Sequence, residues 1–388
     1  MNLSSAISAY FRHAWSGINR REAAFVAVTL LAATVLTLVP TGFERKDDVS
    51  VRARARIVET FNDGVRNYGV IMQGEQIALV RVLNGPFRGL EAEANNILYG
   101  KGDLDKLYRP GDTALVVIDP HEDGSVAALT LVDHWRIDLE LVLVGAFFLL
   151  LLLYGGWTGF KTMTAFLFTA IAVWKMLIPA FLAGVEPVVA SLALVALLSA
   201  VICYLVAGFT KAGTAAFLGS LWGTATSAGI ALALAGPYRL NGSVRPFSET
   251  LRFGGFENLD LTGIFLAGTF LASSGAIMDL AIDVAVAMEE VHKKRPELTF
   301  MELVTSGFTV GRKVFGTMTT TLLLAYTGGF TSLLMVFMAQ GVPIENMFTM
   351  SYVSSELFHT MIGSLGLVFI APFTAVLAAA LYSREPRG

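Results

Sequence analysis

The sequence predicts a polytopic α-helical membrane protein with about eight transmembrane helices and a small β-rich extracytoplasmic domain inserted between helices 1 and 2. Three observations carry this prediction. Of 388 residues, 54% are hydrophobic and only 15% are charged, whereas a soluble domain carries about 25% charged residues. Eight segments are apolar and long enough to cross a bilayer. The region between the first two segments has a different, turn-rich character.

The predicted spans follow from the requirement for about 20 mostly apolar residues. They are residues 22–40, 138–156, 162–183, 187–208, 213–236, 260–288, 314–339 and 361–382. The first span could be a secretory signal, but its apolar run is long and Val39-Pro40-Thr41-Gly42 is a poor cleavage site. We therefore expect a retained anchor, with the chain divided into residues 1–42, 43–137 and 138–388.

Orientation follows from the Lys and Arg residues of the loops, which are enriched on the cytoplasmic side. With a cytoplasmic N-terminus, the inside segments hold 12 of these residues and the short outside loops hold three. Both termini are therefore expected in the cytoplasm and residues 43–137 outside. The net charge of −3 gives no reason to expect nucleic acid. The expected partners are the lipid bilayer, a small solute or ion, and a second copy of the chain in a homo-oligomer.

Residues 43–137 carry short β-branched runs with partial alternation, such as "YGVIMQGEQIALVRVLNG" and "GDTALVVIDP". Gly-Pro, Asn-Gly and Pro-Gly-Asp separate these runs as turns. The pattern predicts a β-barrel or a β-sandwich. The acidic residues that could suggest a metal site are Asp112, Asp119, Glu122 and Asp123. Acidic loops are common on solvated domains, so we assign neither a metal nor a cofactor here.

Three segments of the membrane part begin alike, with "GFKTMTAFLF", "GFTKAGTAAFL" and "GFTVGRKVFGTMTTT" at residues 159, 208 and 307. Each has Gly-Phe, a basic residue and a Thr-bearing helix start. All three precede hairpins that run in the same direction, so the pattern indicates three parallel hairpin repeats. Chance recurrence of Gly, Thr and Phe in a membrane composition is the alternative.

The sixth span contains two carboxylates, Asp279 and Asp283, in an apolar run. Residues spaced by three and four share one helical face. That stripe consists of Gly268, Ala272, Gly275, Asp279, Asp283, Val286 and Glu290. Because an aspartate near the centre of a spanning helix costs about 2.5–3.5 kcal/mol, we expect the pair to meet a coupling cation, a proton or a water-filled cavity. The alternatives are a structural salt bridge from Asp279 to Lys175 and snorkelling of Asp283 into water.

Other polar residues of the spans join this candidate coupling site. Lys175 is the only basic residue deep in a span. The candidate hydroxyl ligands are Thr224, Thr226, Thr317, Thr319 and Thr320. Threonines also occur at helix contacts and bond to their own helix, so packing is the competing explanation. Outside the membrane, the residues of a candidate outer gate are Glu249, Arg252, Glu356 and His359.

Three strings carry a resemblance to a known family: "SSGAIMDLAIDVAVAMEE", "VGRKVFGTMTTTLLLAYTGG" and "IGSLGLVFIAPFTAVLAA". With these, the sequence resembles the YibE/F-like family of bacterial multi-pass membrane proteins. The insert, with its "YRPGDTALVV", fits the layout of that family. The resemblance implies a multi-pass protein of the bacterial inner membrane.

The leading functional hypothesis is a secondary, ion- or proton-coupled transporter of a small solute or ion that uses the acidic pair on helix 6. The alternative is a non-transporting envelope protein whose external β domain binds a partner or ligand. The chain has no GxxxxGK[ST], HExxH or GxSxG motif, so we do not expect an enzyme.

Overall fold

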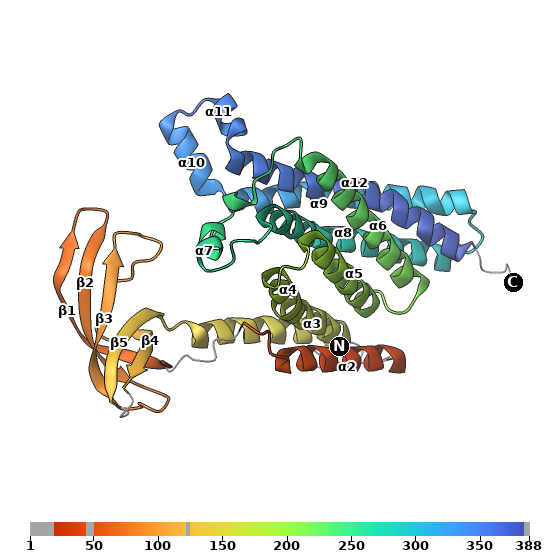
Figure 1. Ribbon diagram of the computed structural model, residues 1–388. Helices are drawn as coiled ribbons and strands as arrows, with labels where there is room; N and C mark the ends of the chain where they lie inside the picture. Colours follow the sequence, from red (N-terminus) through yellow and green to blue (C-terminus); the bar gives the residue numbers. More distant parts are fainter. Residues whose placement is uncertain (1–18, 44–49, 122–124, 384–388) are drawn as a thin grey trace, which may run out of the picture. The chain divides into compact units, whose positions relative to one another are not determined.

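The computed structural model describes residues 19–43, 50–121 and 125–383. The chain forms two compact units, residues 44–149 and the remainder. In Figure 1 the first unit contains the five strands and the second contains the helical bundle.

The first unit is a closed five-stranded barrel. Its strands are β1 (Val51–Asn67), β2 (Met72–Val82), β3 (Glu91–Tyr99), β4 (Thr113–Pro120) and β5 (Val126–His134). They close in the order β1-β2-β3-β5-β4, with β3 and β5 parallel and every other pair antiparallel. This order is that of the OB fold, a five-stranded barrel. Of the two architectures expected from the sequence, the structure has the barrel.

The long strand β1 closes the barrel, and its alternating residues set which side faces the interior. Ala53, Ala55 and Ile57 are buried, while Arg52 and Arg56 are exposed. The same strand pairs with β4 through its first half and with β2 through its second half, with register shifts in the β1–β2 pairing. Such bulges bend a strand and increase its twist, which allows one long strand to lie on both sides of the closure.

A fully buried amide, Gln76 of β2, fixes the loop between β3 and β4. Its Nε2 donates to Asn62 Oδ1 at 2.8 Å and to the Tyr108 carbonyl at 2.9 Å. Its Oε1 accepts from Asn96 Nδ2 at 3.1 Å and from the Tyr108 amide at 3.0 Å. Both donors and both acceptor positions of the amide are therefore satisfied.

We expect Gln76→Leu to destabilise the barrel by about 3 kcal/mol, because it leaves the Tyr108 amide and carbonyl without partners in the interior. The measurement is urea unfolding of residues 43–137 expressed alone, followed by circular dichroism. Gln73→Leu on the exposed face of the same strand is the control, with an expected change within about 0.5 kcal/mol. Equal effects of the two substitutions would contradict the assigned role of Gln76.

The helices have the following bounds. They are α2 (Arg20–Leu38), α3 (Ile137–Ala172), the π-helix η1 (Val173–Leu177), α4 (Ile178–Leu182), α5 (Pro187–Val206), α6 (Lys211–Ala235), the 3₁₀-helix η2 (Gly242–Val244), α7 (Ser248–Phe253), α8 (Leu261–Lys294), α9 (Phe300–Gly328), α10 (Thr331–Gln340), α11 (Ile344–Thr349) and α12 (Ser351–Tyr382). Six helices of the described chain are long and apolar enough to cross a membrane, or seven if the pair α9–α10, bent by 68°, counts as one span. The chain is a polytopic helical membrane protein.

The count differs from eight because the second and third expected spans merge into one helical stretch, Ile137–Leu182. The stretch is not straight. Gly156 has φ +53° and ψ −125°, outside the helical region. A Cβ on Gly159 would lie 2.1 Å from the Leu151 carbonyl oxygen, although residues eight apart in a straight helix are about 12 Å apart along the axis. The chain therefore turns sharply at Gly156.

Proline removes a helical hydrogen bond, so the sequence predicts helix breaks at Pro179 and near Pro372. The changes in the structure are smaller than this prediction. Before Pro179 the helix widens into the π-turn η1 and then continues as α4. At Pro372 the break expected from the sequence is absent, since α12 runs continuously from Ser351 to Tyr382. A membrane helix tolerates proline where neighbouring groups compensate for the missing hydrogen bond.

The bundle is built around α8 and α12, which contact each other and both pack against α6 and α9 (Figure 1). Glycines make these contacts close. A Cβ on Gly219 of α6 would lie 2.2 Å from Thr374 Oγ1, and one on Gly311 of α9 would lie 2.7 Å from Ala371 Cβ. The Gly219-x-x-x-Gly223 face thus brings α6 against α12, as small residues do between membrane helices.

Candidate functional site

One stripe of α8 is left uncovered by the rest of the described chain. Between Leu261 and Glu290, every residue of α8 outside this stripe is buried or half-buried. The exposed residues are Gly268, Ala272, Gly275, Asp279, Asp283, Val286 and Glu290. They are the small and acidic stripe expected from the sequence.

The opposite face of α8 is buried in the centre of the bundle, against α6 and α9. Ile277 is fully buried and lies against α6, where a Cβ on Gly223 would be 3.0 Å from its Cγ2. Val284 and Met288 lie against Gly311 and Gly307 of α9. Residues 277, 284 and 288 project about 140° or more from Asp279 around the helix axis. The two aspartates therefore point away from the tightly packed side.

Neither Asp279 nor Asp283 has a counter-charge in the described chain. No ion pair or hydrogen bond joins either carboxylate to a described side chain, although the two aspartates are one turn apart. Lys175 lies elsewhere, with its Nζ donating to the Val39 carbonyl just after α2 at 2.9 Å. The salt bridge between Asp279 and Lys175, the structural alternative, is not formed.

The threonines of α9 bond to their own helix. Thr317 Oγ1 donates to the Val314 carbonyl at 2.8 Å, and Thr319 Oγ1 to the Phe315 carbonyl at 3.0 Å. Thr320 Oγ1 lies 3.4 Å from the Gly316 carbonyl, and Thr317 and Thr320 are exposed. Each hydroxyl oxygen keeps acceptor lone pairs after donating its proton, so these groups can still act as oxygen ligands.

The two candidate threonines of α6 differ from each other. Thr226 Oγ1 donates to the Trp222 carbonyl at 2.8 Å. Thr224 is 4% exposed, and its Oγ1 has no hydrogen-bond partner within the described residues. Ser227, on the same helix, and Thr374 of α12 also hold buried hydroxyls without a described partner. The α6–α12 contact therefore contains hydroxyl groups with unused hydrogen-bonding capacity.

A second polar cluster joins the loop after α6 to α12. Arg245 Nη1 donates to Glu356 Oε1 at 2.5 Å, and Arg245 Nη2 lies 3.1 Å from His359 Nδ1. The guanidinium also lies over the Phe265 ring of α8, 4.9 Å from its centroid. The side chain of Glu356 is only 13% exposed. One arginine thus links the loop, α8 and α12 through two hydrogen bonds, to Glu356 and to His359, and one cation–π contact.

The partner of His359 fixes its tautomer. A guanidinium has only donors, so His359 Nδ1 must accept and the proton of the neutral ring lies on Nε2. Nε2 is buried without a partner in the described chain, as is the Tyr326 hydroxyl of α9. The two rings are neighbours, with centroids 4.5 Å apart. The cluster therefore contains two buried polar groups that could bind a further ligand or water.

Arg245, the arginine of this cluster, was not identified from the sequence. Glu249 and Arg252 lie on α7, are exposed, and make no contact with Glu356 or His359 in the described residues. The candidate outer gate is thus Arg245, Glu356 and His359, with Arg245 seven residues before the expected arginine. Arg252 was the expected arginine because the spacing Glu249-x-x-Arg252 matches that of Glu356-x-x-His359. No local signal marks Arg245, which follows a 3₁₀-turn in an irregular loop.

A cavity of about 360 Å³ borders the cluster, between α9, α10, α11 and α12. Glu356 and Tyr326 line it, together with Thr327 and Thr360. The remaining lining is apolar or aromatic, including Phe330, Phe337 and Phe348. A mostly apolar space with a few convergent polar groups is the usual form of a small-molecule site.

The described residues contain no group of three or more His, Cys, Asp or Glu side chains that could hold a metal ion. Of the acidic residues noted in the barrel, Glu122 and Asp123 lie outside the described residues. Asp119 accepts a hydrogen bond from Ser50, and Asp112 accepts one from the Arg109 amide. Neither contact assembles a metal site.

No curated protein and no solved structure matches the chain. A family model, described as YibE/F-like protein, matches residues 143–384. The match begins within α3 and extends through α12, so it includes the acidic stripe of α8 and the Arg245 cluster. The chain belongs to the YibE/F-like family.

Proposed function

We propose that the protein is a secondary transporter that couples the movement of a small solute or ion to a proton or a cation bound at Asp279 and Asp283. The observation that carries this proposal is the position of the acidic pair. It occupies the exposed stripe of the helix at the centre of the bundle, with no described counter-charge.

The energetic argument concerns the two charges. Each aspartate in the hydrocarbon region costs about 2.5–3.5 kcal/mol, and such residues usually pair with one another, with backbone groups or with a water-filled cavity. Because Lys175 is engaged with Val39 at 2.9 Å, no structural pairing offsets that cost. A proton, a cation or water along the stripe is the remaining compensation. Small residues at Gly268, Ala272 and Gly275 leave room for it.

The threonines and the outer cluster take supporting roles in this proposal. Thr317, Thr319 and Thr320 of α9 offer oxygen lone pairs to the solute, and α9 contacts α8 on the face opposite the aspartates. Arg245, Glu356 and His359 hold the loop after α6 against α12 and act as the outer gate. Release of this contact would free the segment between α6 and α8. That segment leads directly into α8, the helix that carries the acidic pair.

The topology that we propose has eight spans. The sharp turn at Gly156 divides Ile137–Leu182 into two helices, and the bent pair α9–α10 forms one span. Both termini then lie in the cytoplasm and the barrel lies outside a bacterial inner membrane, in keeping with the distribution of Lys and Arg. The three parallel hairpin repeats stay a prediction.

The barrel favours a second candidate function, that of a non-transporting envelope protein. Its five strands close on themselves and form their own core. Phe61, Ile97 and Tyr99 are exposed on it, and exposed apolar side chains on a small domain can mark a binding surface. In this alternative the barrel binds a partner and the bundle is a scaffold or a signal relay.

Uptake into proteoliposomes separates the two functions. The purified chain is reconstituted, and accumulation of a panel of inorganic cations, anions and small organic acids is measured with and without a pH or Na⁺ gradient. Transport predicts uptake of at least one solute that depends on a gradient and exceeds that of protein-free vesicles. Absence of uptake across the panel, in vesicles with correctly folded protein, would favour the envelope role.

A further inference from the structure

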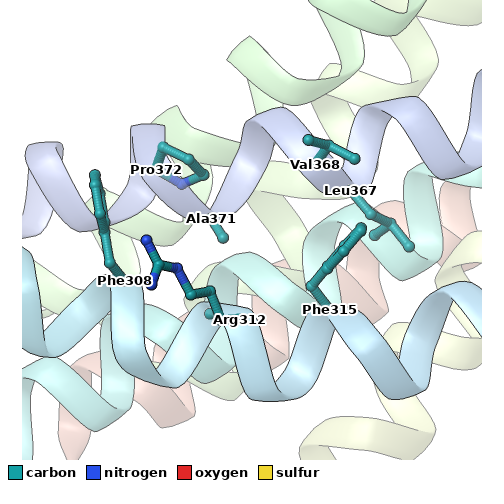
Figure 2. A pocket seen from close by; sticks show the side chains of 8 residues that line it. Phe308, Arg312, Phe315, Leu367, Val368, Ala371 and Pro372 are labelled. Carbon is teal, nitrogen blue, oxygen red and sulfur yellow. The ribbon is translucent and has the colours of Figure 1, made fainter.

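A crevice of about 270 Å³ lies between α9 and α12, away from the acidic stripe. Its α9 wall is made by Phe308, Gly311, Arg312 and Phe315. Its α12 wall is made by Leu367, Val368, Ala371 and Pro372. Figure 2 shows the Arg312 side chain extending from α9 toward α12, with Phe308 on one side and Phe315 on the other.

Arg312 is the only charged group that lines this crevice. It is exposed, and it makes no ion pair or hydrogen bond with the described residues. No acidic residue lines the crevice to neutralise it. A guanidinium has five donors in a fork that matches the oxygens of a phosphate. The crevice thus combines apolar walls with one unsatisfied cationic donor group.

The depth of Arg312 follows from its neighbour. A Cβ on Gly311 would lie 3.6 Å from Val284 Cγ2 of α8. The 34 residues of α8 extend over about 51 Å, so about 10 Å would project from each side of a centred hydrocarbon layer of about 30 Å. Val284 then lies about 5 Å inside the boundary. A long arginine side chain reaches the headgroups from that depth.

The α12 wall offers an acceptor as well. Pro372 has no N–H, so it cannot donate the helical hydrogen bond that the Val368 carbonyl would otherwise accept. Both residues line the crevice, and Val368 is 46% exposed. A donor group of a ligand can therefore bind this carbonyl while an anionic group binds Arg312.

We propose that the crevice binds one anionic phospholipid, with its phosphate on Arg312 and an acyl chain along Phe308, Phe315 and Leu367. The charge and the depth favour this occupant. A second copy of the chain would have to bring an acidic residue to Arg312 in the same place, whereas the bilayer supplies phosphate there already. Basic pockets between spanning helices bind lipid headgroups by this chemistry.

The test uses the full-length protein in detergent, with Arg312→Gln compared against Lys313→Gln. Lys313 is adjacent, exposed and equal in charge, but it does not line the crevice. Native mass spectrometry measures retention of added phosphatidylglycerol and phosphatidylcholine. We expect the wild type to retain phosphatidylglycerol preferentially, Arg312→Gln to retain about tenfold less, as for the loss of a hydrogen bond to a charged group, and Lys313→Gln to change distinctly less.

A second variant keeps the test decisive if Arg312→Gln folds poorly. Val368→Trp leaves the charge in place and fills the crevice from α12, so it too should reduce phosphatidylglycerol retention. Equal losses in Arg312→Gln and Lys313→Gln would overturn the proposal, because they would indicate diffuse surface charge. Equal retention of the two lipids by the wild type would overturn it as well. These outcomes are independent of whether the protein transports a solute.

Discussion

Asp279→Asn is expected to abolish gradient-dependent uptake while leaving the protein folded. An asparagine has nearly the shape of an aspartate but carries no charge and does not release a proton at the pH of the membrane. If Asp279 binds the coupling ion or proton, the substitution removes the coupling step. Removal of an unpaired charge from the hydrocarbon region should raise stability or leave it unchanged. Uptake into proteoliposomes and thermal unfolding in detergent measure the two effects separately.

The controls for this variant come from the same stripe and from Lys175. Glu290→Gln makes the same chemical change at the end of the stripe, where Glu290 is exposed and 3.8 Å from Lys293, and it should retain uptake. Combining Asp279→Asn with Lys175→Met should not rescue activity, because Lys175 bonds to the Val39 carbonyl. Full gradient-dependent uptake by a stable Asp279→Asn protein would refute a coupling role.

Arg245→Gln is expected to destabilise the protein by about 3 kcal/mol. The substitution leaves Glu356, whose side chain is 13% exposed, as a half-buried carboxylate without its arginine partner. Loss of a charged hydrogen bond at such a site has a cost of this size. It also removes the donor to His359 Nδ1 and the contact with Phe265. Unfolding in mixed micelles by titration with a denaturing detergent gives the free energy.

Arg252→Gln is the matched control for this prediction. Arg252 belongs to the same extramembrane loop region but is exposed on α7, so its loss should change stability by no more than about 0.5 kcal/mol. The double variant Arg245→Gln with Glu356→Gln should recover part of the loss, since no unpaired charge is then buried. If Arg252→Gln proved as damaging as Arg245→Gln, the gate would have been assigned to the wrong arginine.

The acidic stripe could be predicted because its spacing of three and four residues is a property of one helix. Gly268, Gly275 and Asp279 share a face whatever surrounds α8, and the structure leaves that face exposed. The position of the strands could likewise be predicted, since turn residues and alternation are local. The choice of a barrel over a sandwich could not, because it depends on pairing between β1 and β4, which are far apart in the sequence.

Features that depend on tertiary contacts could not be predicted from the sequence. The arginine that pairs with Glu356 is chosen by the path of the loop after α6, so residue spacing pointed to Arg252 in place of Arg245. Lys175 was expected near Asp279 on the basis of depth alone, yet the bundle brings it to the end of α2. Pro372 was expected to break its helix, but α12 continues through it.

The central claim, that the stripe of α8 faces water within the membrane, is tested most directly by thiol reactivity at Gly275. A cysteine fits there, because a Cβ on Gly275 would have no atom within 4 Å. Water-soluble methanethiosulfonates react with the thiolate, which forms in water and not in lipid or in a dry interior. In a Cys203→Ala background, we predict rapid labelling of Gly275→Cys in reconstituted protein and none of Ala281→Cys, which lies on the buried face. A folded Gly275→Cys protein that stays unlabelled would contradict the account, because the stripe would then face lipid or another protein surface.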